Sequence, residues 1–413
     1  MATPQSIRHL NEVQVLNTLL RHGALSRAEL ARRVGLNRSS IGSVVGGLVE
    51  AGLLREREQR PEPEAVNEQV GRPGIAIEIN PEGGAFIGVE IGIERLAVMV
   101  VDLAGEVIGR QAVAYDTANV APQDTVRRIG GLVEEARARL AGVAPIRGLG
   151  AAIPALVDEA GTVVNGLVLG WRDVPLHRLL LEELGPAAAD FPVAVENDAN
   201  AFGVAALWRN PPLMEGTVAF FTMENGVGGA IFHNGELFRG SFGYAGEFGH
   251  LLLSEPAPIT AQQKRRPAAH FENHVGKDAV LESYRTAGEG AAPRAGGPSG
   301  GLSALIAAHQ AGEPAARQVV RRWGEKMAQG LTQVSAILNP HSIILGGAVA
   351  PLFGLAGEDV RAALHREFID GFPMPEIQVS PLGEDGTPLG AALLMHRKFF
   401  SVDAQVLPKP SLS

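Results

Sequence analysis

The sequence predicts an α/β protein in which an N-terminal winged helix-turn-helix precedes a two-lobed body. Three short helical patterns with recognisable cap residues come first in the chain. Runs of strands followed by helices then occur twice, which is typical of two similar lobes. The charge is divided in the same way. Residues 1–60 hold nine Arg, no Lys and five Glu, a balance of +4, whereas the rest of the chain has a balance of −13, and together they give the net charge of −9. This division favours a DNA-binding module at the N-terminus.

The composition excludes several kinds of site. The chain has 413 residues and no cysteine, so it has no disulfide framework, Cys-ligated zinc site, iron–sulfur cluster or thiol nucleophile. No window of about 18 uncharged apolar residues is present to span a bilayer. The N-terminus also lacks the apolar segment of an export signal, so we expect a cytoplasmic protein without membrane contact.

The first three helices are predicted from apolar spacing and from their caps. The first helix ends at His22-Gly23. The second begins at Ser26, which forms an S-x-x-E capping box with Glu29, and ends at Gly35, a residue suited to the left-handed conformation. Asn37 caps the third helix. The apolar stripe of that helix consists of Ile41, Val44, Val45 and Leu48.

The other face of the third helix indicates DNA binding. It presents small and hydroxyl-bearing residues after Arg38, including Gly42 and Gly46, and each glycine inside a helix costs roughly 1 kcal/mol relative to Ala. Such a face suits close approach to a DNA groove. The alternative is a solvated helix whose glycines are incidental. The expected DNA-contacting residues are Arg27, Asn37, Arg38, Ser39, Ser40, Ser43 and Arg72.

A β-wing is expected to follow the third helix. The segments Arg55-Glu56-Arg57-Glu58 and Gly71-Arg72-Pro73-Gly74 are interpreted as its two sides, with a Pro- and Glu-rich loop between them. Arg72 suits entry into a narrow minor groove, although a plain turn residue fits equally well. The DNA-binding domain is therefore placed at 1–60 and the wing and linker at 61–84.

The body is predicted to form two lobes, a first at 85–200 and a second at 201–380. A C-terminal helix and tail at 381–413 are expected to pack back on the first lobe. The expected strands of the first lobe are Ala85–Ile91, Leu96–Leu103, Val107–Val113 and Ile146–Ile153, with a helix over Pro122–Ala141. The second block begins at Val193 and contains a long helix near Ala316–Leu338 and a last helix near Thr387–Phe399.

Several segments of the body resemble the ROK family of repressors, open reading frames and kinases. The stretch from Met223-Glu-Asn-Gly226 through Gly246-Glu247-Phe248-Gly249-His250 matches the signature of that family at every specified position. The segments Glu196–Asn200, Leu169–Pro175 and Ser342–Gly347 resemble further family segments, in the family's order, and Gly71-Arg72-Pro73 resembles the connector of its repressor branch. The resemblance implies an actin-like, sugar-kinase-type (ribonuclease H-like) fold in a homodimer or tetramer.

The same resemblance implies a sugar site. A polyol needs several fixed donors and acceptors, because each buried hydroxyl left unpaired costs roughly 1–3 kcal/mol. The sugar-contacting positions that the resemblance gives are Asn197, Asp198, Glu247, His250 and Glu272, the last within a loop that differs from the family pattern.

Nucleotide binding is not expected. In the family's kinases the residue at Asp198 acts as general base, and an Asp-x-Gly-Gly-Thr turn cradles phosphate. This chain has Glu90-Ile91-Gly92-Ile93-Glu94 at that turn. A branched Ile93 and a Glu94 carboxylate both oppose phosphate binding. We therefore expect no catalytic residue and no cofactor.

A metal is not expected either. The family commonly builds a zinc module from cysteines and the residue at His250, but the matching stretch of this chain, residues 263–272, has no thiolate. His250, His270 and His274 remain as a conceivable histidine-only site, yet His270 and His274 also fit an ordinary helix start.

These observations predict a sugar-responsive DNA-binding regulator, a repressor of carbohydrate-metabolism genes that a sugar bound between the lobes releases from a palindromic operator. Two alternatives stay open. One is an ATP-dependent sugar kinase that carries a DNA-binding head, and the other is a DNA-binding protein whose body is a ligand-free dimerisation unit.

Overall fold

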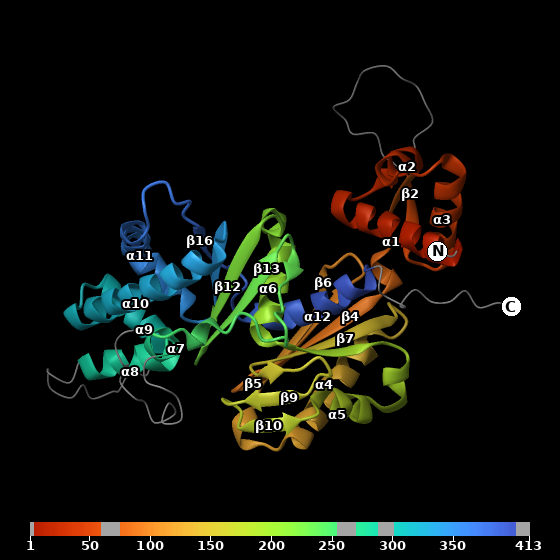
Figure 1. Cartoon of the computed structure of the whole chain (residues 1–413). Helices are drawn as coiled ribbons and strands as arrows, with labels where there is room; N and C mark the ends of the chain where they lie inside the picture. The colour runs from red at the N-terminus through yellow and green to blue at the C-terminus, as the bar shows by residue number, and fades with distance from the viewer. Residues whose placement is uncertain (1–3, 59–74, 254–269, 288–300, 402–413) are drawn as a thin grey trace. The chain divides into compact units, whose positions relative to one another are not determined.

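A computed structural model of the chain describes residues 4–58, 75–253, 270–287 and 301–401. They form two compact units (Figure 1). Unit 1 contains the N-terminal part up to Ile153, the segment Val168–Glu196 and the C-terminal part from Ala391. Unit 2 contains Pro154–Leu167 and Asn197–Gly390, so the chain crosses between the units four times. Within the described residues no helix is long and apolar enough to cross a membrane.

The head is a winged helix, as predicted. Its helices are α1 (Pro4–His22), α2 (Arg27–Val34) and α3 (Arg38–Glu50). The strands β1 (Leu25–Ser26), β2 (Leu54–Glu58) and β3 (Ile75–Ile79) form an antiparallel sheet in the order β1-β3-β2, in which β2 and β3 are the two sides of the wing. The predicted second side lay a few residues earlier, around Gly71–Gly74, which is outside the described residues.

The predicted caps of the head are confirmed. Ser26 and Glu29 form a reciprocal capping box, in which the Ser26 hydroxyl accepts from the Glu29 amide at 3.2 Å. Gly35 ends α2 with a φ of 76°. The Asn37 side chain accepts from the Ser40 amide at 2.8 Å and so begins α3. These local bonds satisfy amide groups that a helix start leaves without a partner.

The rest of unit 1 is built on a five-stranded mixed sheet. Its strands are β4 (Ala85–Ile91), β5 (Arg95–Asp102), β6 (Val107–Ala114), β7 (Ile146–Ile153) and β11 (Val193–Asn197), in the order β11-β7-β4-β5-β6. The helices of this part are α4 (Pro122–Leu140) and α5 (Leu176–Leu184). The second half of α12 (Gly386–Phe399) packs on the sheet, where Gly150 leaves room for the Ala391 carbonyl and Phe86 meets the rings of His396 and Phe399.

Unit 2 repeats this strand order. Its strands are β12 (Thr217–Met223), β13 (Val227–His233), β14 (Glu236–Leu237), β15 (Ser342–Gly346) and β16 (Glu376–Val379), in the order β14-β13-β12-β15-β16. In both sheets an antiparallel triplet precedes the two remaining strands, and the first strand of the triplet pairs in parallel with the fourth strand. This repeat is the internal similarity that the sequence predicted. The short strands β8 (Leu156–Val157) and β9 (Val163–Gly166) also belong to unit 2, whereas β10 (Trp171–Val174) belongs to unit 1.

Helices cover the second sheet around a large apolar core. They are α6 (Asp198–Arg209), α7 (Glu272–Val275), α8 (Lys277–Ala287), α9 (Gly301–Gln310), α10 (Pro314–Leu338) and α11 (Phe353–Glu367). The core includes Phe221, Phe271 and Trp323, all nearly fully buried. Figure 1 shows α8, α9 and α10 gathered together in this unit.

Candidate functional site

The first candidate site is the outer face of α3. Arg38, Ser39 and Ser43 are exposed on this helix, whereas its apolar stripe is buried. Arg38 forms no ion pair with any described residue. Asn37 and Ser40 share the cap bond, which positions the start of this face.

Two glycines leave the same face of α3 with little side-chain bulk. A Cβ added at Gly42 or Gly46 meets no atom within 4 Å, so neither glycine is required for packing inside the described protein. Two such residues inside a helix cost roughly 2 kcal/mol relative to Ala. A flat helix face that tolerates this cost is suited to a partner that approaches the backbone closely.

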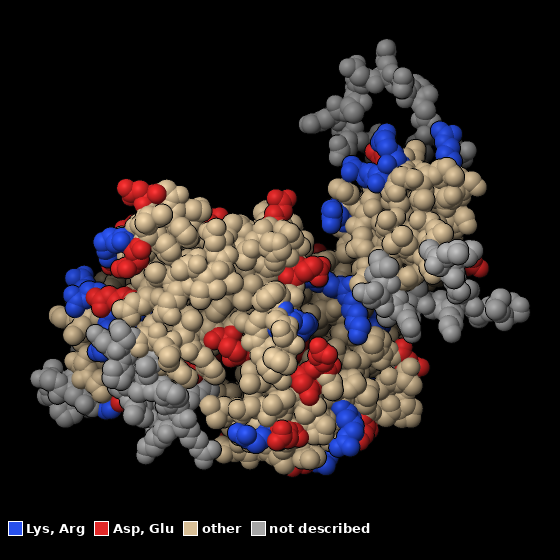
Figure 2. All heavy atoms as spheres, viewed as in Figure 1, with Lys and Arg blue, Asp and Glu red and all other residues tan. Residues whose placement is uncertain are grey.

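The arginines of α2 and the wing behave differently from Arg38. Arg27 pairs with Glu56 at 2.8 Å, and Glu78 pairs with Arg55 at 2.7 Å and with Arg57 at 3.5 Å. The positive charge of the wing is therefore partly offset before any DNA arrives. Figure 2 shows basic side chains of the head gathered around α2 and β2. Arg72, the remaining predicted DNA contact, lies outside the described residues.

The second candidate site begins at the N-terminus of α6. The Asn197 side chain accepts from the amides of Ala199 at 2.9 Å and Asn200 at 3.1 Å, and its Nδ2 donates to the Ala155 carbonyl at 3.2 Å. The neighbouring Asp198 carboxylate accepts from the Ala199 amide at 2.9 Å. Both side chains are thus fixed at the end of strand β11, where rigid elements hold polar groups.

The environment of Asp198 changes its acidity. Burial, with a smaller contribution from the carboxylates of Glu247 and Glu224, raises the pKa of this carboxyl from 3.8 to about 6, against the opposing effect of the Ala199 amide. A carboxyl with a pKa near neutrality exchanges protons readily and hydrogen-bonds hydroxyl groups in either protonation state.

A small pocket lies beside these residues. Its lining includes Asn197, Asn200, Tyr244 and Glu247 from unit 2. Its volume is only about 10 Å³, which is about the space that one water molecule needs. A monosaccharide therefore does not fit this arrangement unless the lining moves.

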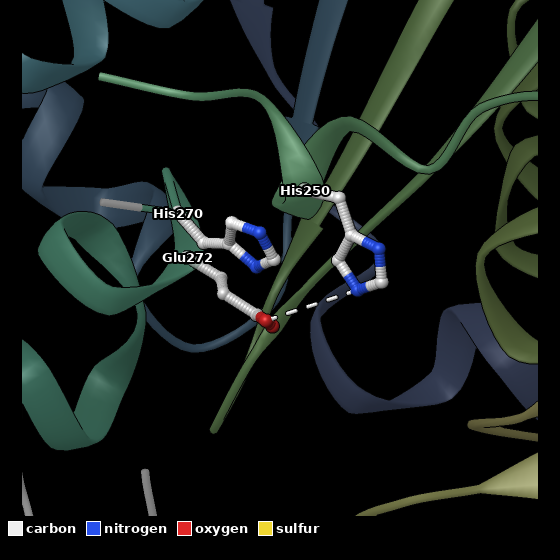
Figure 3. Close-up of side chains that lie close together, drawn as sticks. All are labelled: His250, His270 and Glu272. Carbon is white, nitrogen blue, oxygen red and sulfur yellow. Dashed lines mark ion pairs between the residues drawn. The ribbon is translucent and has the colours of Figure 1, made fainter. Parts of the chain in front are cut away.

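A third group of side chains includes His250, which directly follows the glycine-rich turn Gly246-Glu247-Phe248-Gly249. His250 and His270 stack with ring centroids 5.0 Å apart, and the His250 Nε2 lies 3.9 Å from a Glu272 carboxylate oxygen (Figure 3). The Glu272 side chain is 6% exposed, whereas that of His250 is 52% exposed. The His250 amide donates to the Glu247 carbonyl at 3.1 Å, so one short turn holds both residues. Glu247 also lines the pocket beside Asn197.

Among the described residues, these three side chains also form a group that could hold a metal ion. One ligand atom of each lies within 4.8 Å of the others, and imidazole and carboxylate are ligands that zinc accepts. The group differs from the histidine-only set considered from the sequence, because Glu272 takes the third place and His274 instead lines a separate groove. The absence of cysteine leaves this group without the thiolates of the family's zinc module.

Sequence reasoning missed three residues of the site. Asn200 and Tyr244 line the pocket beside Asn197. Asn200 lay inside the Glu196–Asn200 motif, so a signal for it was present, whereas Tyr244 had none. The third is Glu224, whose carboxylate accepts from the Ala348 amide at 2.9 Å across unit 2.

Two family models match the chain. The ROK family model matches residues 86–398, and the MarR family model matches residues 9–62, which contain the helices of the winged helix.

Relatives that align with nearly the whole chain include regulators. A xylose repressor of Caldicellulosiruptor bescii is 24% identical over 94% of this chain and 96% of its own length. A xylose repressor of Bacillus subtilis is 21% identical over 96% and 97%. A glucokinase of Streptomyces coelicolor is 29% identical over 75% of this chain and 96% of its own length. The kinase match is thus shorter on this chain than the repressor matches.

Solved structures show the same fold. A ROK family transcriptional regulator, a homolog of the E. coli MLC protein, aligns with 96% of this chain and 97% of its own at a TM-score of 0.78 and 20% identity. A ROK family glucokinase from Streptomyces griseus, solved with glucose and AMPPNP, aligns with 75% of this chain and 99% of its own at a TM-score of 0.62 and 24% identity.

Proposed function

Because this chain belongs to the ROK family and carries a winged helix ahead of the family's body, we propose that it is a transcriptional repressor that a sugar releases from DNA. The observation that carries this proposal is the match of repressors along both the head and the body. Operator binding would place the protein in the cytoplasm and would use two heads of a homodimer or tetramer on a palindromic site.

The exposed face of α3 would read the operator. Arg38 is exposed and has no described ion-pair partner, so it would contact a base edge or phosphate. Ser39 and Ser43 would hydrogen-bond beside it. Arg27 would have to leave Glu56 or share it, so its contribution would be smaller than that of Arg38. Arg72, Asn37 and Ser40 complete the proposed interface.

The polar cluster of unit 2 would hold the sugar. Both donors and acceptors for hydroxyl groups come from Asn197 at the end of β11, Asp198 at the start of α6, Glu247 and His250 on the glycine-rich turn, and Glu272 on α7. The small volume of this pocket, about 10 Å³, supports a binding step that moves its lining. Sugar would then change operator affinity only as far as it prefers one conformation of the protein over the other.

We also propose that the body has lost phosphoryl transfer. By the family resemblance, the turns around Gly226 and Gly346-Gly347 belong to the nucleotide site. The Glu224 carboxylate accepts from the Ala348 amide in this region, and it presents a negative charge where a nucleotide would bring more. On the first-lobe turn, Glu90 of β4 pairs with Arg95 of β5 across the hairpin that, by the family resemblance, would hold phosphate in a kinase.

The retained family glycines have a packing role that is independent of nucleotide. A Cβ at Gly346 would lie 2.2 Å from the Phe202 ring, and a Cβ at Gly228 would lie 2.7 Å from the Thr222 hydroxyl. Gly347 adopts a φ of 83° directly over the Met223 backbone. These residues would therefore persist in a protein without kinase activity.

The test combines DNA and sugar binding. We would select operator DNA from a random pool with the full-length protein and measure its affinity with and without a sugar panel that begins with xylose. The isosteric variants Glu247→Gln and Glu272→Gln should abolish the sugar effect, whereas the control Glu215→Gln, at an exposed residue, should keep it. If no sugar alters operator affinity, the sensor proposal is wrong.

A second assay separates the regulator from a kinase. Two observations would fit a kinase. Glucokinases are among the relatives, and the raised pKa of Asp198 suits a group that accepts a proton during phosphoryl transfer. We expect no sugar-dependent ADP formation with ATP and Mg²⁺. Activity that Asp198→Asn abolishes would overturn this expectation.

A further inference from the structure

A second, larger pocket lies in unit 2. It is a groove between α8 and α10 with a volume of about 240 Å³, just below the range of roughly 300–1,000 Å³ that small-molecule sites occupy. Val280 of α8 and Val319 and Trp323 of α10 give it an apolar floor, and all three are buried. The Trp323 indole donates to the Val275 carbonyl at 3.2 Å, so the floor is tied to α7.

Most of the other described lining residues are polar, and the charged ones, Arg322 and Lys326, are both basic. Lys326 lies in the groove with only 4% exposure, and Arg322, one turn before it on the same helix, is exposed. Among the described lining residues there is no Asp or Glu. Two cations near a low-dielectric floor attract an anion more strongly than they would in open water.

Uncharged polar groups complete the groove. The groove is also lined by Asn273 and His274 of α7, by Ser283 of α8 and by Gln318 of α10. These groups hydrogen-bond hydroxyls and phosphate oxygens alike. Arg and Lys together suit a phosphate, which carries close to two negative charges and accepts a fork of N–H groups.

We propose that this groove binds a phosphorylated metabolite of monosaccharide size, at a site separate from the polar cluster around Asp198. The cations hold the phosphoryl group, and the hydroxyl and amide groups hold the polyol part. The apolar floor meets the carbon faces of the ligand.

The groove is linked to the proposed sugar site through α7. This four-residue helix carries Glu272 on the sugar side, and the next two residues, Asn273 and His274, enter the groove. A ligand that shifts α7 in the groove therefore changes the position of Glu272. This coupling, unlike the groove itself, rests on the proposed sugar function.

The test uses full-length protein and calorimetric titration with glucose 6-phosphate, ribose 5-phosphate, inorganic phosphate and glucose. We expect at least one sugar phosphate to bind more tightly than both inorganic phosphate and glucose. Lys326→Met, which keeps side-chain length and packing, should weaken that binding about tenfold or more, since bonds to charged groups are the strong ones.

Arg322→Ala should weaken the same binding without endangering the fold, because this side chain is exposed. Its matched control is Arg321→Ala, the neighbouring exposed residue that lies outside the groove and pairs with Glu325 at 3.9 Å. Failure of every sugar phosphate to bind, or unchanged affinity in both Lys326→Met and Arg322→Ala, overturns the proposal.

Glu247→Gln distinguishes the two sites. It should leave sugar-phosphate binding unchanged, and loss of that binding would place the ligand at the Asp198 cluster and overturn the proposal. The two proposals can fail separately. If no free sugar alters operator affinity, the sugar-sensor proposal is wrong, but the groove should still bind a sugar phosphate in this titration.

Discussion

Replacing Asp198 by Asn should stabilise the protein while it weakens sugar binding. The carboxyl is partly buried at the start of α6, close enough to Glu247 and Glu224 for their charges to raise its pKa. Asparagine keeps an oxygen that accepts from the Ala199 amide, as the carboxylate does at 2.9 Å. The substitution therefore removes the ionisation and leaves the local hydrogen bond in place.

The size and pH dependence of the effect follow from the pKa. Folding raises it from 3.8 to about 6, and each tenfold change in an ionisation equilibrium is worth about 1.4 kcal/mol, so ionised Asp198 destabilises the folded state by about 3 kcal/mol at most. Well below pH 3.8 the carboxyl is protonated in both states and the cost is absent, and at pH 4 the cost is still small. As pH rises to about 6 the unfolded chain releases this proton first, so the cost grows and is complete above the folded pKa. Partial solvent contact reduces the expected value to about 1–3 kcal/mol.

The assay is thermal unfolding of the wild type and Asp198→Asn between pH 4 and pH 8, with sugar titrations of both proteins. We expect nearly equal melting temperatures at the acid end and a higher one for the variant at pH 8, together with about tenfold weaker sugar binding at pH 8 from the loss of a charged hydrogen bond. Asp359→Asn, on the exposed face of α11, controls for removal of one negative charge. A variant that is equally or less stable at pH 8 would refute the assigned environment of Asp198.

Three further predictions test other parts of the chain. Gly46→Ala should stabilise α3 by about 1 kcal/mol in thermal unfolding and weaken operator binding in a fluorescence assay, and unchanged DNA affinity would remove the reason for the flat face. Gly150→Ala should destabilise unit 1 by about 1–3 kcal/mol, since its Cβ would lie 2.1 Å from the Ala391 carbonyl oxygen, whereas Gly109→Ala, with 3.5 Å to Val100, should melt more like the wild type. Treatment with EDTA should leave the melting temperature unchanged, and a fall that zinc reverses would show that the group of His250, His270 and Glu272 holds a metal.

The helix boundaries at the caps of the head were predictable nearly to the residue because their signals are local, whereas the second strand of the wing lies a few residues later than predicted. A capping box needs only two side chains three positions apart, and the bond between Ser26 and Glu29 forms as the spacing indicated. The Asn37 cap is equally local. Ion pairs between distant elements carry no such signal, so the pairing of Arg27 with Glu56, 29 positions away, could not be anticipated.

The candidate site was predictable by family motif and less so by geometry. The motifs gave Asn197 and Glu247, which line one pocket, and His250 and Glu272, which lie 3.9 Å apart. Spacing alone did not decide whether His270 or His274 would join His250. The turn into α7 decides it, because it leaves His270 stacked on His250 and directs His274 into the other groove.

Charge offers a reason why the proposed sugar site would be compatible with the proposed loss of nucleotide binding. The carboxylates of Glu224 and Glu247 are already near enough to Asp198 to disfavour its negative charge. A nucleoside triphosphate would add several more negative charges to this field, and the repulsion grows as the local dielectric falls. A neutral sugar adds none and offers hydroxyl donors to the same oxygens. The carboxylate of Glu224 would therefore oppose a phosphoryl donor without opposing a sugar, and Gly346 and Gly347 would still be needed because Phe202 and the Met223 backbone pack against them.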